Sequence, residues 1–121
     1  MKVTCKFITK SLYITGYSVG GFNRNPSVNY RFSYLGNGVF TWTGKMKVDT
    51  GNGFKIIEYG VYDPSWGPVG DKTNVGDVTK GTAEWSETDS KWDLKSTQGF
   101  SEGEYTVVLD TVKGTLTVTP R

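Results

Sequence analysis

The fold is decided near the end of the sequence, by Gly103-Glu-Tyr-Thr-Val-Val-Leu-Asp110 and Thr115-Leu-Thr-Val-Thr-Pro120, with the turn Lys113-Gly114 between them. Apolar side chains recur at every second position of both segments, which is the period of a β-strand with one buried face. A short turn containing glycine between two such segments indicates an antiparallel hairpin. This end of the chain is therefore predicted to form two paired strands.

The same alternation recurs upstream. It appears at 30–34 before the turn Gly36-Asn-Gly38, and again at 40–48 with an interruption at glycine. The hairpin signal Gly51-Asn-Gly53 then leads into the apolar positions of 54–56. Strand-like segments separated by turns at intervals of about eight to twelve residues are typical of sandwiches and barrels. We predict an all-β, antiparallel β-sandwich of about eight strands.

One stretch of the chain is harder to interpret. Residues 60–81 contain five Gly and two Pro and are predicted to form a loop. Residues 82–98 contain neither Gly nor Pro. Their alternation fits strands, whereas 89–96 also fits a short helix, and the sequence leaves both alternatives open.

Composition restricts the range of functions. With 121 residues the chain fits a single domain, 1–121, and its formal charge of +2 argues against a nucleic-acid binder, which usually shows a basic patch. Histidine is absent, which removes the commonest metal ligand and general base. Cys5 is the sole cysteine, so no intrachain disulfide forms, and we expect it to be a small buried apolar side chain. No cofactor is expected.

Acidic side chains provide the remaining route to catalysis or metal binding. A pair of carboxylates could in principle cleave glycosidic bonds, yet most of the acidic residues occupy turns or outward-facing strand positions. Asp63, Asp71 and Asp77 are conceivable calcium ligands, but their spacing matches no defined calcium loop. Ordinary turn-forming aspartates are the preferred interpretation. We predict that the protein is not an enzyme.

Trp66 is the aromatic residue that points most directly to a function. It lies in Pro64-Ser-Trp-Gly-Pro68, and these turn-forming neighbours disfavour a core strand. A flat apolar ring with a polar edge suits a sugar, which has C–H groups on one face and hydroxyls around its rim. Trp66 is therefore predicted to be exposed and to stack on a sugar, with Tyr62 close by in sequence.

Other aromatic residues allow two interpretations each. Trp42 shares its strand face with Phe40 and is predicted to be in the core. Trp85 and Trp92 fit a core position and a ligand-facing position equally well. Lys55 alternates with apolar neighbours, and by periodicity alone it is expected on a solvated face.

The order of several segments resembles a known family. The segments concerned are, in order, Leu12-Tyr-Ile-Thr-Gly16, Phe40-Thr-Trp-Thr-Gly44, Phe54-Lys-Ile56, the Trp66 loop and the final hairpin. This order resembles that of the repeated domain of the SusE/SusF-like surface glycan-binding lipoproteins, which belong to outer-membrane starch-utilisation systems. The resemblance covers nearly the whole chain, although each motif is short.

This resemblance implies a β-sandwich that binds an α-glucan chain without cleaving it. In the family, aromatic residues form a curved platform and a lysine on the strand hydrogen-bonds sugar hydroxyls, which matches Trp66 and Lys55 here. It also implies a location at the cell surface, attached to the outer membrane through sequence beyond this chain. Residues 71–98 depart from the family by being longer and more polar.

Together these observations predict a non-catalytic carbohydrate-binding domain with an antiparallel β-sandwich of immunoglobulin-like or carbohydrate-binding-module type. Its partner is a polysaccharide or oligosaccharide, and it neither binds nucleic acid nor inserts into a membrane through this segment. The predicted site comprises Trp66, Lys55, Tyr62, Trp85 and Trp92. The chain is expected to be a monomer or part of a longer protein. The alternatives are a ligand-free structural spacer and a protein-adhesion domain.

Overall fold

The chain forms ten strands and three short 3₁₀ helices in a computed structural model that describes residues 11–60, 65–68, 75–78, 81–87 and 91–121. For residues 68, 75–78 and 81–87 only the backbone is described. The strands are β1 (Leu12–Gly16), β2 (Ser33–Gly36), β3 (Val39–Met46), β4 (Phe54–Glu58), β5 (Ser65–Pro68), β6 (Val75–Val78), β7 (Gly81–Glu87), β8 (Lys91–Leu94), β9 (Gly103–Asp110) and β10 (Thr115–Pro120). The helices are η1 (Tyr17–Val19), η2 (Val28–Tyr30) and η3 (Ser96–Gln98).

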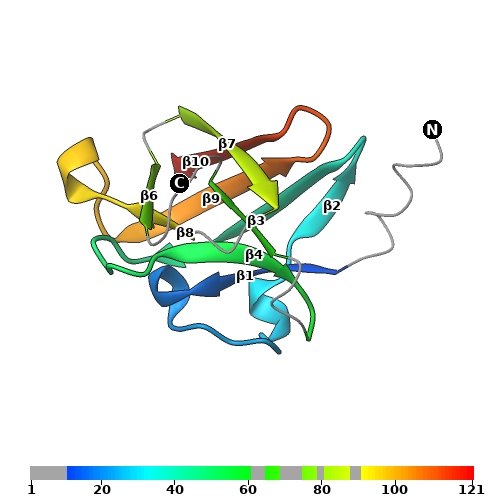
Figure 1. The fold of residues 1–121 in the computed structure, drawn as a ribbon, viewed down its shortest axis with the longest axis horizontal. Coiled ribbons are helices and arrows are strands. Elements are labelled where there is room, and N and C mark those ends of the chain that lie inside the picture. The colour runs from blue at the N-terminus through cyan, green and yellow to red at the C-terminus, as the bar shows by residue number, and fades with distance from the viewer. Residues whose placement is uncertain (1–10, 61–64, 69–74, 79–80, 88–90) are drawn as a thin grey trace.

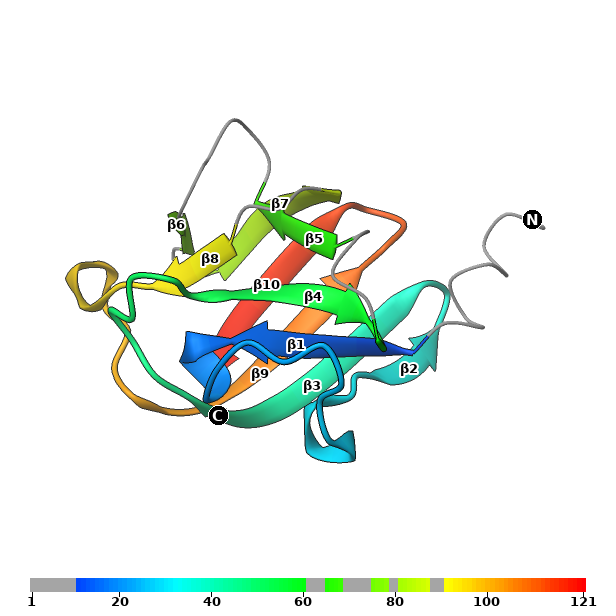
Figure 2. The same cartoon turned by 60° about the horizontal axis from the view of Figure 1, so that its bottom comes forward.

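The strands form two layers that are joined by β7 (Figure 1). Hydrogen bonding follows the order β2-β3-β9-β10-β7-β5-β4-β8-β6, and β1 pairs with the free side of β4. Figure 2 shows β1 and β4 lying in front of β3, β9 and β10. Every described strand pair is antiparallel except β6 and β8, which are parallel. The predicted all-β sandwich is confirmed.

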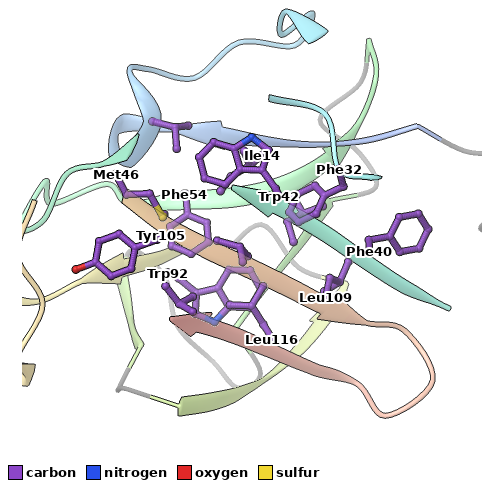
Figure 3. Packing of buried hydrophobic residues seen from close by; sticks show 14 of the residues in the cluster. Ile14, Phe32, Phe40, Trp42, Met46, Phe54, Trp92, Tyr105, Leu109 and Leu116 are labelled. Atoms are coloured by element: carbon purple, nitrogen blue, oxygen red, sulfur yellow. The ribbon is translucent and has the colours of Figure 1, made fainter. Parts of the chain in front are cut away.

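The final hairpin lies within one layer and supplies much of the core. β9 pairs with β3 along eight positions, from Val39 opposite Asp110 to Met46 opposite Gly103. Alternate side chains of β9 point inward and are buried, as the sequence pattern predicts. They pack with large side chains of the facing layer, including Phe54 and Trp92 (Figure 3). Burial of each such side chain stabilises the fold by about 1.5–3 kcal/mol.

The stretch predicted to be a loop contains two of the ten strands. β5 and β6 both fall within residues 60–81, and Gly81 begins β7, so the loop prediction is wrong for these nine residues. The backbone of Trp66 pairs with Ile56 on one side and with Glu87 on the other. Pairing on both sides satisfies the backbone polar groups and outweighs the local preference of Gly67 and Pro68 for turns. Residues 91–94 form strand β8, which resolves the choice between strand and helix there.

β4 differs from an ordinary sandwich strand because both of its faces are covered. Phe54 and Ile56 face the core, whereas Lys55 and Ile57 alternate with them and are buried on the outer side. The segment after β1 lies over that outer side. It is held by Thr15, whose hydroxyl accepts a hydrogen bond from the Asn23 N–H (2.8 Å) and donates to the Asn23 carbonyl (3.2 Å).

Two glycines allow three chain segments to meet without side chains between them. Gly16 has a φ of 140°, and a Cβ there would overlap the carbonyl oxygen of Gly53. Gly53 has a φ of 60°, and a Cβ there would overlap the carbonyl oxygen of Trp92. The Ser18 N–H donates to the Gly53 carbonyl at 3.2 Å. The ends of β1, β4 and β8 are thus in direct backbone contact.

Replacement of Gly53 by alanine should strongly destabilise the protein. The Cβ would overlap the backbone carbonyl oxygen of Trp92, so the backbone itself would have to shift, and we expect the free energy of unfolding to fall by about 4 kcal/mol or more. Gly51→Ala is the matched control, because Gly51 also has a positive φ but has open space around the Cβ position. It should cost only about 1 kcal/mol. Chemical denaturation of both variants measures the difference, and equal losses would contradict the close contact.

Candidate functional site

A hollow of about 280 Å³ lies on the outer side of β4, away from the core. We call it the outer hollow. It is lined by Tyr17, Phe22, Asn52, Lys55 and Lys91. These residues come from four separate parts of the chain: η1, the segment after it, the turn before β4 together with β4 itself, and the start of β8. The outer hollow is therefore lined by an aromatic pair, an amide and two ammonium groups.

The aromatic pair is positioned by a backbone bridge. Gly16 and Gly21 exchange two hydrogen bonds, from the Gly16 N–H to the Gly21 carbonyl (3.1 Å) and from the Gly21 N–H to the Gly16 carbonyl (2.8 Å). Tyr17 and Phe22 each follow one of these glycines. Their ring centroids are 5.6 Å apart with an interplanar angle of 50°. Tyr17 remains 48% exposed, so one side of the pair faces solvent.

Two lysines approach the rings from the sheet. Lys55 projects from the outer side of β4 and is only 4% exposed. Lys91 begins β8, is half-buried, and its ammonium nitrogen lies 5.7 Å from the centroid of the Phe22 ring. That distance is within the range of a cation–π contact. The outer hollow thus combines apolar ring surface with positive charge.

Asn52 occupies a turn that is pinned to β8 by a buried carboxylate. Asp93 accepts hydrogen bonds from the Thr50 hydroxyl (3.0 Å), the Thr50 N–H (3.4 Å) and the Gly51 N–H (3.1 Å). It also pairs with Lys95 at 3.4 Å, and its own side chain is fully buried. A carboxylate with this many donors is strongly held. The turn and the strand that carries Lys91 therefore keep a fixed relation.

The same turn begins at Asp49, whose carboxyl is exposed and has a lowered pKa. The hydrogen bond from the Ser96 hydroxyl is the main cause, followed by one from the Ser96 N–H, which lies 3.1 Å from Oδ1. Together they hold the pKa below the ordinary value of 3.8, helped by the positive charge of Lys95 and opposed by slight desolvation.

A pH dependence follows for the variant Asp49→Asn, which keeps a residue that tolerates the φ of 55°. Because the folded-state pKa is lowered, the charged carboxylate contributes stability that is present above the unfolded value near 3.8 and is lost as the pH falls through the folded value. The wild type should therefore melt above the variant at about pH 6, and the two should converge by about pH 2. Thermal melts across this range measure the gap, and a gap that persists in acid would contradict the assignment.

Of the predicted site residues whose side chains the structure describes, which are Lys55, Trp66 and Trp92, only Lys55 lines the outer hollow. Lys55 lines it, although its position on β4 is buried rather than solvated. The prediction that Trp66 is exposed on a loop is wrong, because Trp66 lies in β5, is 7% exposed and belongs to the core. Trp92 is also in the core, fully buried against Phe54 with ring centroids 5.5 Å apart (Figure 3). Neither tryptophan presents a face to a ligand.

The other predicted residues have different outcomes. Tyr62, Asp63 and Asp71 lie outside the described residues, as does Cys5. The backbone of Trp85 pairs with Pro68 in the ladder of β7 and β5, and the side chains of Trp85 and Asp77 lie outside the described part. Trp42 is 5% exposed in the core, as predicted.

Four residues of the outer hollow were not predicted from the sequence: Tyr17, Phe22, Asn52 and Lys91. A signal was present for three of them, because Tyr17 and Phe22 each follow a glycine and Asn52 stands between two glycines. Glycine marks places where backbones approach closely or turn, and side chains beside such places are often presented to solvent. Lys91 carried no comparable signal.

A second hollow of about 390 Å³ lies over β3 and includes Tyr30, Trp42 and Lys45. There Tyr30 covers Trp42, with centroids 6.5 Å apart and nearly parallel planes. The indole N–H of Trp42 is already engaged, since it donates to the Asn29 carbonyl at 2.9 Å. Trp42 itself is only 5% exposed, whereas Tyr17 in the outer hollow is 48% exposed.

The described part of the chain shows neither a cluster of metal ligands nor a membrane-spanning helix. It contains no group of three or more acidic or cysteine side chains arranged to hold a metal ion. None of its helices has the length and apolar character needed to cross a membrane. Comparison of the chain with protein-family profiles, with curated proteins and with solved structures finds no match.

The core position of Trp66 predicts a stability effect. Trp66→Ala should lower the free energy of unfolding by about 3–5 kcal/mol, because it removes a buried indole from the space between the layers. Tyr17→Ala is the control, since its ring is half exposed and its loss should change stability by less than about 1 kcal/mol. Urea denaturation compares the two. A stable Trp66→Ala variant would show that the indole is not part of the core.

Proposed function

We propose that this chain is a non-catalytic carbohydrate-binding domain and that the outer hollow is its binding site. The observation that supports this most is the tilted pair of Tyr17 and Phe22, half open to solvent, with ammonium and amide donors beside it. A sugar ring presents C–H groups to an aromatic face and hydroxyl oxygens to surrounding donors. The outer hollow offers both kinds of contact within one ligand's reach.

Each residue of the outer hollow has a role in binding that follows from the chemistry of its side chain. Tyr17 provides the accessible stacking face, and Phe22 supports it from behind. Asn52 supplies an amide that both donates and accepts, while Lys55 and Lys91 supply donors for hydroxyl or more acidic oxygens. Such an open site exchanges water bridges with solvent, so the affinity should be modest.

Binding without catalysis is also the better match to the lining of the outer hollow. Hydrolysis of a glycosidic bond commonly uses two carboxyl groups on opposite sides of the bond. The described lining side chains are two rings, an amide and two ammonium groups. In the proposed role the protein holds a glycan and leaves its bonds intact.

We also propose that the chain is related to the SusE/SusF-like lipoproteins and that it lies at the cell surface. Lys55 supports these proposals, because the lysine matched by that resemblance lines the outer hollow. The tryptophan matched by it does not support them, since Trp66 is buried.

A structural spacer is the second candidate, and one observation favours it. Trp42, Trp66 and Trp92 are all in the core, as expected if tryptophans serve packing alone. The two functions differ in what they require of Tyr17: a spacer has no use for an exposed ring beside two lysines, and a glycan-binding domain depends on it.

Replacement of Tyr17 separates these functions. Tyr17→Ala should weaken glycan binding by roughly tenfold to thirtyfold, as expected when one aromatic contact of about 2 kcal/mol is lost. Tyr59→Ala is the matched control, because Tyr59 is 55% exposed and follows the other end of β4. It should bind like the wild type. The wild type is first screened on a glycan array, and its ligands are then titrated by calorimetry.

Calorimetry is preferred to tryptophan fluorescence, since the three described tryptophan rings are buried and would respond weakly to a ligand on the outer side. Absence of binding to every glycan would favour the spacer. Equal glycan binding by the wild type and Tyr17→Ala would show that the binding site is not the outer hollow.

A further inference from the structure

We propose that the ligand of the outer hollow is an acidic saccharide, in which a carboxylate or sulfate group on the sugar pairs with Lys91 and Lys55. This inference rests on the proposed function and adds the chemical class of the glycan. It starts from the charge around the rings: two of the five lining residues are lysines, and no acidic side chain is among them in the described part.

Lys91 carries most of this inference. The ion pairs of the described residues include Lys95 with Asp93 and Arg121 with Glu104, and Lys91 belongs to neither of these. Its ammonium contacts the face of Phe22 instead. A cation–π contact orients an ammonium group but uses none of its N–H donors in a conventional hydrogen bond. The contact therefore leaves the N–H donors of Lys91 available to a ligand.

The nearest carboxylate on the same strand is already committed elsewhere. Asp93 is two residues from Lys91, yet it is fully buried and engaged with Thr50, Gly51 and Lys95. Its charge is balanced by these donors and by the ammonium of Lys95. Asp93 thus fixes the turn that carries Asn52 while leaving the positive charge of Lys91 to the outer hollow.

Lys55 adds a second ammonium at greater depth. It is only 4% exposed, and a cation in such a place interacts more strongly with an anion than a cation in bulk water does. Lys55 also has a contact within the protein. Because an ammonium group has three N–H donors, that contact does not prevent Lys55 from donating to a ligand.

A neutral glucan would form weaker hydrogen bonds with the two lysines than an acidic saccharide would. Its hydroxyls accept ordinary hydrogen bonds, whereas a carboxylate or sulfate oxygen forms charge-assisted bonds that are roughly twice as strong. The chain as a whole has a formal charge of only +2, so its net charge attracts polyanions only weakly. Selectivity should therefore depend on the rings and the lysines together.

The test is calorimetric titration of the full chain with three oligosaccharides of equal length: a neutral gluco-oligosaccharide, an oligogalacturonide and a sulfated galactan fragment. At least one acidic oligosaccharide should bind about tenfold more tightly than the neutral one at low salt, and this preference should shrink as the salt rises to about 0.5 M. The uronate and the sulfate then reveal which acid the hollow prefers.

Lys91→Gln should remove most of the preference for the acidic ligand, lowering its affinity by roughly fivefold or more. The affinity for the neutral ligand should fall by a smaller factor, because that ligand loses a hydrogen bond to a hydroxyl but no charge pair. Lys91→Arg should retain the preference, because it keeps the positive charge. Lys113→Gln, an exposed lysine in the β9–β10 turn, is the matched control and should behave like the wild type.

The outcomes separate the two proposals. If the neutral oligosaccharide binds as well as both acidic ones and Tyr17→Ala weakens it, the acidic class is wrong and the glycan-binding function stands. If polyglutamate binds as tightly as the acidic sugars, the attraction is merely electrostatic and the acidic class is again wrong. If none of the three saccharides binds and the glycan array is blank, both proposals fail.

Discussion

Backbone contact between Gly16, Gly53 and Trp92 is the constraint on which the arrangement of this domain depends. It brings the ends of β1, β4 and β8 together at a distance that excludes side chains. Three of the five residues that line the outer hollow are direct neighbours of this contact in sequence: Tyr17 follows Gly16, Asn52 precedes Gly53, and Lys91 precedes Trp92. A contact that is purely structural thereby assembles chemically useful side chains from distant parts of the chain.

The sequence predicted well those features that depend on local periodicity. Alternation in β3, β9 and β10 correctly indicated strands and the core position of Trp42, because a half-buried strand repeats every second residue. Trp66 could not be placed in this way. Its turn-forming neighbours suggested a loop, whereas pairing with Ile56 and Glu87, which are remote in sequence, makes the segment a strand.

The site was predictable only in part, for a related reason. Periodicity alone assigns Lys55 to a solvated face, and the family resemblance was what drew attention to it. The segment over the outer side of β4, held by Thr15, buries that face instead. Tyr17 and Phe22 are neighbours through the bridge between Gly16 and Gly21, and hydrogen bonds of this kind leave no periodic trace in a sequence.

The position of the final hairpin within its layer has a consequence for how the chain reaches this structure. β9 lies between β3 and β10, and β10 in turn pairs with β7. Residues 103–120 therefore join β3 to β7, two strands that precede them in the sequence. Until these residues are synthesised, the edge of β3 that pairs with β9 has no partner, and the core lacks the buried side chains of β9 and β10. Strand pairing over such separations is slow, and an unpaired edge invites association between unfinished chains. The domain should therefore be most exposed to aggregation on the ribosome, in the interval before its last hairpin emerges.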